Sequence, residues 1–448
     1  PTRRSRYLAP HDHSIMTRSL KLLLIADSDS QLLACEALCR CQTAWAVEFT
    51  INIIPRDGTP QHILQRIANL GTLWRQNLSR LLNNPKLLQF DAVGVFLTGS
   101  KLNDIRIALE RHQQRPKLFC GFNGVVLEHF VEGISWRLGY DLICLSGPRD
   151  RDALNQLVAK TPFAHQQTVL TGLQRNGTIK ALSPAGHRPK RLVFAEQVVM
   201  PSSARDRAEM VKILAELAIR SPNWEVLIKP RITPGDATFH DVDTHIGTTL
   251  SQTLGVPPVN LKLDYRPLPD LLRKAPLMAT ISSTAFFDAL DFGCRPIAMN
   301  DLGLHASHGS HVFAGSGVWR SLRDVPNLDE LEQELPEPNP EWLDWMGYSE
   351  RYGAGDLFEA LENLKPASTT GITHCGYPTN TQSSFNQLRV GAEAAICTGD
   401  WRGAADLLTQ AAQMRPQHRG VARRVAAVSC RNPLLRRIGL ILSYRDLG

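Results

Sequence analysis

Three hydroxyl-bearing residues stand where an apolar segment meets a helix-forming one. Leu277–Ile281 is typical of a buried strand, Ser282, Ser283 and Thr284 follow it directly, and a helix is expected over Ala285–Phe292. The first turn of a helix offers unpaired backbone N–H groups, and hydroxyls there can cap the helix or help to bind a phosphate. Capping needs only one hydroxyl, so the three together favour a phosphate site.

Two cations flank a proline at the end of another expected strand. Lys229-Pro230-Arg231 follows the apolar segment Trp224–Ile228. The proline restricts the backbone, so Lys229 and Arg231 are expected to face the same crevice as the hydroxyls. They could neutralise the phosphate of a leaving nucleotide without a metal ion. The alternative is a basic surface turn.

The segment Arg191–Ala195 predicts a strand that ends in two polar residues. Glu196 and Gln197 could reach the base or the ribose of a nucleotide bound at the same edge of the sheet. A polar loop without a ligand is an equal alternative.

A pair of carboxylates follows the first apolar segment, Leu20–Ala26. Asp27 and Asp29 are two residues apart, so each could raise the pKa of the other and prepare a general base for an acceptor hydroxyl. We favour Asp29, because Asp27 is nearer the strand and could hold the loop. The alternatives are that one Asp caps the next helix or that the Asp-x-Asp triplet binds a metal ion. We expect no metal site here, nor at the second triplet, Asp241–Asp243.

Two loops that follow expected strands contain glycines, which let a backbone approach a ligand closely. Both loops are candidates for acceptor binding, through Thr98, Gly99, Ser100, Asn123 and Gly124, and the alternative is that they are ordinary turns. Three histidines, at 305, 308 and 311, lie in a Gly- and Ser-rich segment that predicts a loop. They could contact the leaving group, or simply be solvated, and a metal site is the least favoured interpretation.

The elements that must position these residues alternate between strand and helix in two successive runs. Strands are expected over 20–26, 47–54, 91–97, 117–122 and 140–145, and again over 191–195, 224–228, 277–281 and 295–299. A single long helical region is expected over 61–88. This alternation predicts the α/β class with two Rossmann-like, doubly wound domains, in which ligands bind beyond the carboxyl ends of the strands.

The sequence of 448 residues predicts four parts. Residues 1–18 are expected to be a disordered leader, 19–180 an acceptor domain, 190–365 a nucleotide-sugar donor domain, and 366–448 a basic helical appendage with one tetratricopeptide-like hairpin. From Trp401 to Gly448 there are nine arginines and two acids, so the tail carries the net charge of +7 and the body is nearly neutral. This distribution argues against a nucleic-acid-binding protein. The tail could be a solvated helix face, or could contact an anionic membrane surface or an anionic polymer.

Two stretches resemble known families. The donor half, with IKPR and TISSTAFFDALDFGCRPIAM, resembles bacterial two-Rossmann (GT-B) transferases that use CMP-activated sugars, among them sialyltransferases and polysialyltransferases. The resemblance implies that Lys229 and the Ser282–Ser283 pair hold the cytidylate phosphate, although Arg231 stands where those enzymes have a histidine. The same segment also resembles CDP-glycerol glycerophosphotransferases. The first half, with ADSDSQLLACEAL and GFNGVV, resembles a group of bacterial GT-B glycosyltransferases, and the likeness extends over about residues 20–350.

These features together predict a glycosyltransferase that uses a nucleotide-activated, CMP-linked sugar, a glycan or lipid-linked acceptor, a carboxylate base and no cofactor. The alternatives are a CDP-alditol phosphotransferase and a non-catalytic nucleotide-sugar-binding protein. No run of about 18 apolar residues and no apolar leader are present, so we expect a cytoplasmic protein, with contact to the inner membrane face as a further alternative.

Overall fold

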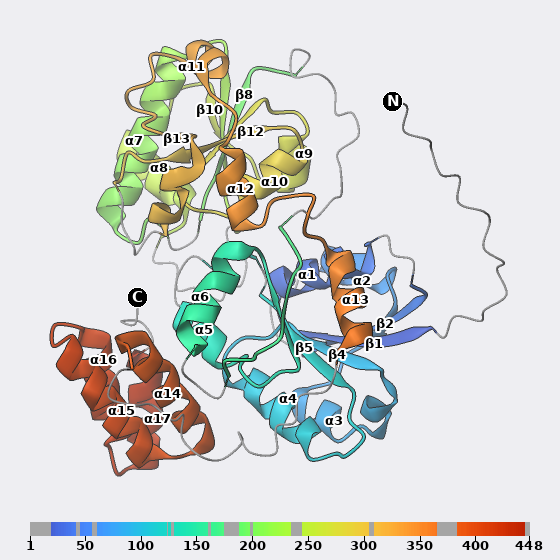
Figure 1. The fold of residues 1–448 in the computed structure, drawn as a ribbon. Coiled ribbons are helices and arrows are strands. Elements are labelled where there is room, and N and C mark those ends of the chain that lie inside the picture. Colours follow the sequence, from blue (N-terminus) through green and yellow to red (C-terminus); the bar gives the residue numbers. More distant parts are fainter. Residues whose placement is uncertain are drawn as a thin grey trace, which may run out of the picture.

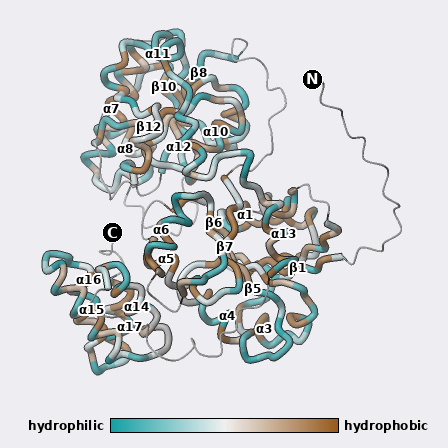
Figure 2. Tube along the Cα trace, viewed as in Figure 1, coloured by the Kyte–Doolittle hydropathy of each residue, from teal (hydrophilic) through white to brown (hydrophobic). Residues whose placement is uncertain are grey.

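Two parallel β-sheets form the body of the chain, and a bundle of helices follows them (Figure 1). The computed structural model describes residues 19–41, 45–55, 61–122, 124–126, 130–159, 163–173, 188–197, 200–233, 244–303, 309–364 and 383–443. The inner strands β4 (Ala92–Val95), β6 (Leu142–Leu145) and β11 (Leu277–Thr280) are buried at every residue, as expected of parallel strands whose two faces are both covered. The most hydrophobic stretches of the trace accordingly include the strands of the sheets (Figure 2).

The first sheet has the order β3-β2-β1-β4-β5-β6-β7, and every pair is parallel. Its strands are β1 (Leu20–Ala26), β2 (Val47–Ile53), β3 (Thr72–Trp74), β4 (Ala92–Val95), β5 (Lys117–Cys120), β6 (Leu142–Leu145) and β7 (Thr168–Leu170). The connecting helices are α1 (Asp29–Cys39), α2 (Gln61–Ala68), α3 (Leu78–Leu82), the 3-10 helix η1 (Pro85–Gln89), α4 (Ser100–Glu110), α5 (Phe130–Ser135) and α6 (Pro148–Val158).

The expected long helix over residues 61–88 is wrong. This segment forms α2, the edge strand β3, α3 and η1. Gly71 marks the first break, because a Cβ at this position would lie 2.4 Å from the carbonyl oxygen of Phe49. Asn77 and Asn84 then cap the next two short helices by accepting backbone hydrogen bonds.

The second sheet has the order β10-β9-β8-β11-β12-β13 and is also parallel. Its strands are β8 (Arg191–Ala195), β9 (Glu225–Lys229), β10 (Leu261–Leu263), β11 (Leu277–Thr280), β12 (Arg295–Met299) and β13 (Trp319–Arg320). The helices that accompany it are α7 (Ala204–Arg220), α8 (Ile246–Leu254), α9 (Leu268–Leu272), α10 (Ala285–Asp291), the 3-10 helix η4 (Ser310–Ser316), α11 (Leu328–Glu334) and α12 (Pro340–Met346).

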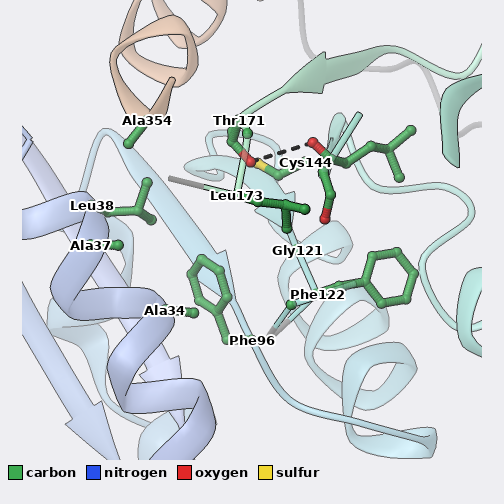
Figure 3. Close-up of a pocket in the computed structure, with 14 residues that line it drawn as sticks. Ala34, Ala37, Leu38, Phe96, Gly121, Phe122, Cys144, Thr171, Leu173 and Ala354 are labelled. Atoms are coloured by element: carbon green, nitrogen blue, oxygen red, sulfur yellow. Dashed lines mark hydrogen bonds between the residues drawn. The ribbon is translucent and has the colours of Figure 1, made fainter. Parts of the chain in front are cut away.

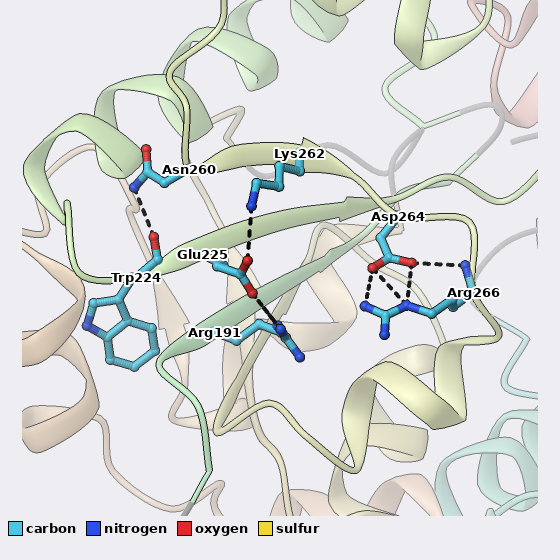
Figure 4. A network of polar contacts seen from close by, with 7 residues as sticks. All are labelled: Arg191, Trp224, Glu225, Asn260, Lys262, Asp264 and Arg266. Carbon is cyan, nitrogen blue, oxygen red and sulfur yellow. Dashed lines mark hydrogen bonds and ion pairs between the residues drawn. The ribbon is translucent and has the colours of Figure 1, made fainter.

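An ion-pair ladder crosses three strands of this second sheet (Figure 4). Glu225 on β9 accepts from Arg191 on β8 at 2.5 Å and from Lys262 on β10 at 3.1 Å. The hydrogen bonds from Arg191 and Lys262 lower the pKa of the Glu225 carboxyl group. The ladder thus links the edge strand β10 to β9 and β9 to β8.

Helix α13 (Ala354–Asn363) follows the second domain but completes the core of the first. Leu357, Phe358 and Leu361 are buried against β1, β2 and β5 residues, and the Phe358 ring meets that of Phe49 edge-on, with 6.3 Å between centroids. Lys117 on β5 donates to the carbonyl oxygen of Leu361 at 2.5 Å. The chain therefore crosses back from the second domain to the first (Figure 1).

Because Phe358 is fully enclosed, its truncation should be costly. We expect Phe358→Ala to lower the free energy of unfolding by about 3–5 kcal/mol, through lost burial and the cavity that it leaves. Leu88→Ala is a suitable control, because Leu88 lies in the same domain but is 39% exposed. Urea denaturation measures both variants, and equal, small losses would show that α13 is not part of the first core.

The tail forms four helices, α14 (Phe385–Thr398), α15 (Trp401–Met414), α16 (Arg419–Val428) and α17 (Pro433–Ser443). Consecutive helices pack on one another, so the tail holds two hairpins where the sequence predicted one. Their shared core includes Leu388, Leu408 and Val421. Helix α14 also packs on α5 and α6, which attaches the bundle to the first domain. Among the described residues, no helix combines the length and the hydropathy that crossing a membrane requires.

Candidate functional site

The order of strands in the second sheet reverses between β8 and β11, where ligands of such sheets bind beyond the carboxyl ends. Two side chains join the loops on either side of this point. The backbone N–H of Ser282 donates to Oε1 of Gln197 at 3.0 Å, and Nε2 of Gln197 lies 3.3 Å from the Ser282 hydroxyl. Two residues that the sequence placed in separate polar loops thus form one contact.

The two hydroxyl residues that follow differ in their roles. Oγ of Ser283 accepts from the backbone N–H of Ala285 at 3.2 Å, so Ser283 caps the first turn of α10. Thr284 is the N-cap residue by position, but its side chain makes no capping bond. Ser283 and Thr284 are half-buried, whereas Ser282 is 2% exposed. The helix behind them is fixed by Phe287, which stacks on Trp342 with 5.9 Å between centroids.

Lys229 ends β9, and Arg231 lies on the following loop, which a buried carboxylate holds. Oε2 of Glu196 accepts from the backbone N–H of Arg231 at 3.0 Å, and Oε1 accepts from Arg207 on α7 at 2.9 Å. Glu196 therefore joins the loop after β8 to the loop after β9. Arg207 was not anticipated, because its position on an amphipathic helix carries no signal of this contact. The nucleotide-binding role of Glu196 stays a prediction.

Lys229 and Arg231 differ in exposure. Arg231 is exposed, whereas Lys229 is half-buried and donates to the carbonyl oxygen of Pro230 at 2.5 Å. Burial, together with the charge of Arg231, lowers the pKa of the Lys229 ammonium group. An anion bound beside it would offset this penalty.

In the first sheet the corresponding reversal falls between β1 and β4. Asp27 follows β1 with 2% exposure, and its Oδ2 lies 2.5 Å from Nζ of Lys101 on α4. Its backbone N–H donates to Oε1 of Gln31 at 2.7 Å. Asp29 is the first residue of α1 and Ser28 is its N-cap, so neither Asp occupies the capping position. Lys101 comes directly after the predicted acceptor loop and was not predicted to contribute.

A cavity of about 80 Å³ lies beyond the carboxyl ends of β4–β7 (Figure 3). Gly121 and the predicted acceptor residue Gly124 line it, beside Phe96, Leu38 and Ala354. Its walls are mostly apolar. Of the other predicted acceptor residues, Thr98 is exposed, Gly99 precedes α4 with φ +67°, and Ser100 begins that helix.

A larger cavity of about 710 Å³ lies between the two domains and the start of the tail. Arg149 on α6 and His311 on η4 line it, together with Trp345 on α12 and Ser384 before α14. None of the predicted donor residues lines it. The domains also meet beside it, where the backbone N–H of Leu173 donates to the carbonyl oxygen of Gly347 at 3.0 Å.

Several predicted or weighed residues lie outside the described part of the chain. These are Asn123, the triplet Asp241–Asp243, His305 and His308. Within the described residues, no three His, Cys, Asp or Glu side chains are grouped so that they could hold a metal ion. Metal independence stays a prediction.

The chain has two Rossmann-like domains, each with polar loops where its strand order reverses, and α13 crosses back from the second domain to the first. This architecture defines a GT-B-type protein. The model of the family described as "Putative glycosyltransferase (DUF6716)" matches residues 22–364, and the chain belongs to this family. The match confirms the predicted class of enzyme, a glycosyltransferase. It covers both sheets and ends with α13, before the tail.

No curated protein matches this sequence closely enough to count as a relative. Among solved structures, the chain is similar to UDP-GlcNAc 2-epimerase from Neisseria meningitidis bound to UDP-GlcNAc, with 13% identity, a TM-score of 0.47, and coverage of 77% of this chain and 100% of that one. It is also similar to UGT89C1 of Arabidopsis thaliana complexed with UDP, with 14% identity, a TM-score of 0.46, and coverage of 77% and 99%. MurG of Acinetobacter baumannii has 11% identity, a TM-score of 0.42, and coverage of 77% and 99%. At this level of similarity, these structures say nothing about the activity of this chain.

Proposed function

We propose that this glycosyltransferase transfers a sugar from a CMP-linked donor to a glycan or lipid-linked acceptor, without a metal ion. One observation carries the proposal. The loops after β8, β9 and β11 are joined by the Gln197–Ser282 and Glu196–Arg231 contacts, so that cations and hydroxyls share one edge of the sheet. A preorganised group of donors of this kind stabilises negative charge that develops on a leaving group.

The reaction assigns different work to the two domains. As the acceptor hydroxyl attacks the anomeric carbon, the bond from sugar to phosphate breaks and CMP leaves with the electron pair. Lys229 and Arg231, with the hydroxyl residues Ser282, Ser283 and Thr284, hold the phosphate. Asp29 removes the proton of the acceptor hydroxyl, and Asp27, paired with Lys101, holds the loop in place.

Calorimetric titration of CMP, CDP and UDP, each with and without EDTA, tests the donor. We expect cytidine nucleotides to bind most tightly and EDTA to change nothing. Tighter binding of UDP would exclude the CMP-linked donor, and loss of binding in EDTA would exclude metal independence. Product analysis then separates the reactions, because phosphate retained in the new linkage would indicate a phosphotransferase.

The hydroxyl pair gives a second test. We expect Ser282→Ala with Ser283→Ala to weaken CMP binding by about 1–3 kcal/mol, the scale of hydrogen bonds to a charged group. Ser251→Ala on α8 is the control, because Ser251 is an exposed serine of the same domain. Full affinity in the double variant would mean that the hydroxyls only shape the loop.

A further inference from the structure

Helix α17 has two opposite faces, and only one of them is covered by the bundle. On the inner face, Leu440 packs against the bundle core, and the buried Ser443 hydroxyl lies 3.1 Å from Nη1 of Arg424. The outer face has five large aliphatic residues, each between 44% and 67% exposed: Leu434, Leu435, Ile438, Ile441 and Leu442. Their spacing places all five on one side of an α-helix. We call these five residues the outer face of α17.

The sequence segment that contains this face has charges of a single sign. Between residues 407 and 443 the chain contains seven arginines and no aspartate or glutamate. Arg431, which precedes α17, and Arg437 on α17 are exposed. Arg419 and Arg423 are exposed on the neighbouring helix α16. Arg424 and Arg436 are used within the bundle, the first in a pair with Glu393 and the second over the Trp401 ring.

We propose that the outer face of α17 docks on an anionic lipid bilayer, with its aliphatic side chains among the acyl chains and its arginines at the headgroups. An interfacial helix combines an apolar face with cations that attract anionic lipids, and α17 has both. A nucleic acid would use the arginines but would not need five exposed aliphatic residues, because single strands stack their bases on aromatic rings. The inference is independent of the donor chemistry proposed above.

Docking through α17 would hold the first domain near the membrane. Helix α14 packs on α5 and α6, so the bundle is attached to the domain that is expected to bind the acceptor. A lipid-linked acceptor would then be presented to this domain from the surface on which α17 lies.

The test is co-sedimentation of the full-length chain with vesicles of phosphatidylcholine, alone or mixed with phosphatidylglycerol. We expect binding to the mixed vesicles only, weakened when salt rises from about 0.1 M to about 1 M and the Debye length falls from about 10 Å to about 3 Å. The triple variant Leu435→Glu, Ile438→Glu, Ile441→Glu should lose at least about tenfold in binding. Arg431→Gln and Arg437→Gln should each lose about fivefold.

A matched control separates docking from a general effect of added charge. Val256 and Val259 are 89% and 91% exposed in the second domain, and Val256→Glu with Val259→Glu should bind vesicles like the parent chain. Circular dichroism verifies that the α17 variants keep their helices. Equal binding to both vesicle types, or full binding by the folded triple variant, would overturn the proposal. Two other results would also overturn it. One is a parent chain that is dimeric while the triple variant is monomeric, and the other is tighter binding to an RNA oligonucleotide than to the mixed vesicles.

Discussion

Donor affinity is expected to fall by about 3–6 kcal/mol when Lys229 and Arg231 are both replaced by alanine, since each hydrogen bond to a charged group contributes about 1.5–3 kcal/mol. The loss amounts to roughly a hundredfold to ten-thousandfold in the dissociation constant. Lys229 is the last residue of β9 and Arg231 follows two residues later, where Glu196 binds its backbone N–H. Without these two cations, the hydroxyls of the neighbouring loop would have to bind the phosphate with no positive charge nearby to neutralise it.

Calorimetric titration of CMP measures this loss, and Arg273→Ala with Lys274→Ala is the matched control. Arg273 and Lys274 are exposed in the same domain, and replacing both removes the same amount of positive charge. If both double variants lose equally little affinity for CMP, the phosphate lies elsewhere.

The lowered pKa of Lys229 gives a pH-dependent test. As the pH rises, Lys229 should lose its proton, and CMP affinity should fall, at a lower pH than for an ordinary lysine. The Lys229→Arg variant should move this fall to higher pH.

Sugar transfer is expected to slow by about 10²–10⁴-fold in the Asp27→Asn, Asp29→Asn double variant, the usual contribution of a general base. Donor binding should stay unchanged, because both residues belong to the first domain. Transfer and CMP titration, measured on the same preparation, separate chemistry from binding.

The single variants assign the roles within this pair. Asp29→Asn should account for most of the loss, whereas Asp27→Asn should act through the loop that Lys101 holds. Asp104→Asn on α4 is the control, because Asp104 is an exposed carboxylate of the same domain. Unchanged transfer in the double variant would place the base on another residue.

Sequence patterns predicted the two sheets well where strands are long and buried. The segments at 20–26 and 191–195 are apolar almost throughout, and both form strands next to the reversal in strand order. The shorter strands β3, β7, β10 and β13 have two or three residues each, too few to show a hydrophobic period. They were missed, and the second hairpin of the tail was missed as well.

The candidate site was predictable in part for a related reason. That Gln197 and Ser282 would be neighbours follows from the rule that loops at a strand-order reversal meet. Two other contacts depend on how helices pack on the sheet. Arg207 binds Glu196, 11 positions away, and Lys101 binds Asp27, 74 positions away. No local pattern reveals such contacts, nor the cavity that three parts of the chain enclose.

The return of α13 to the first domain also constrains how the protein is made. Leu357, Phe358 and Leu361 belong to the first core, yet they come after the whole second sheet in the chain. During translation, the core of the first domain therefore cannot be completed until α13 has left the ribosome. A fragment that stops between β7 and β8 would expose this unfinished apolar surface, so co-expression with the missing helix is a rational way to obtain that half.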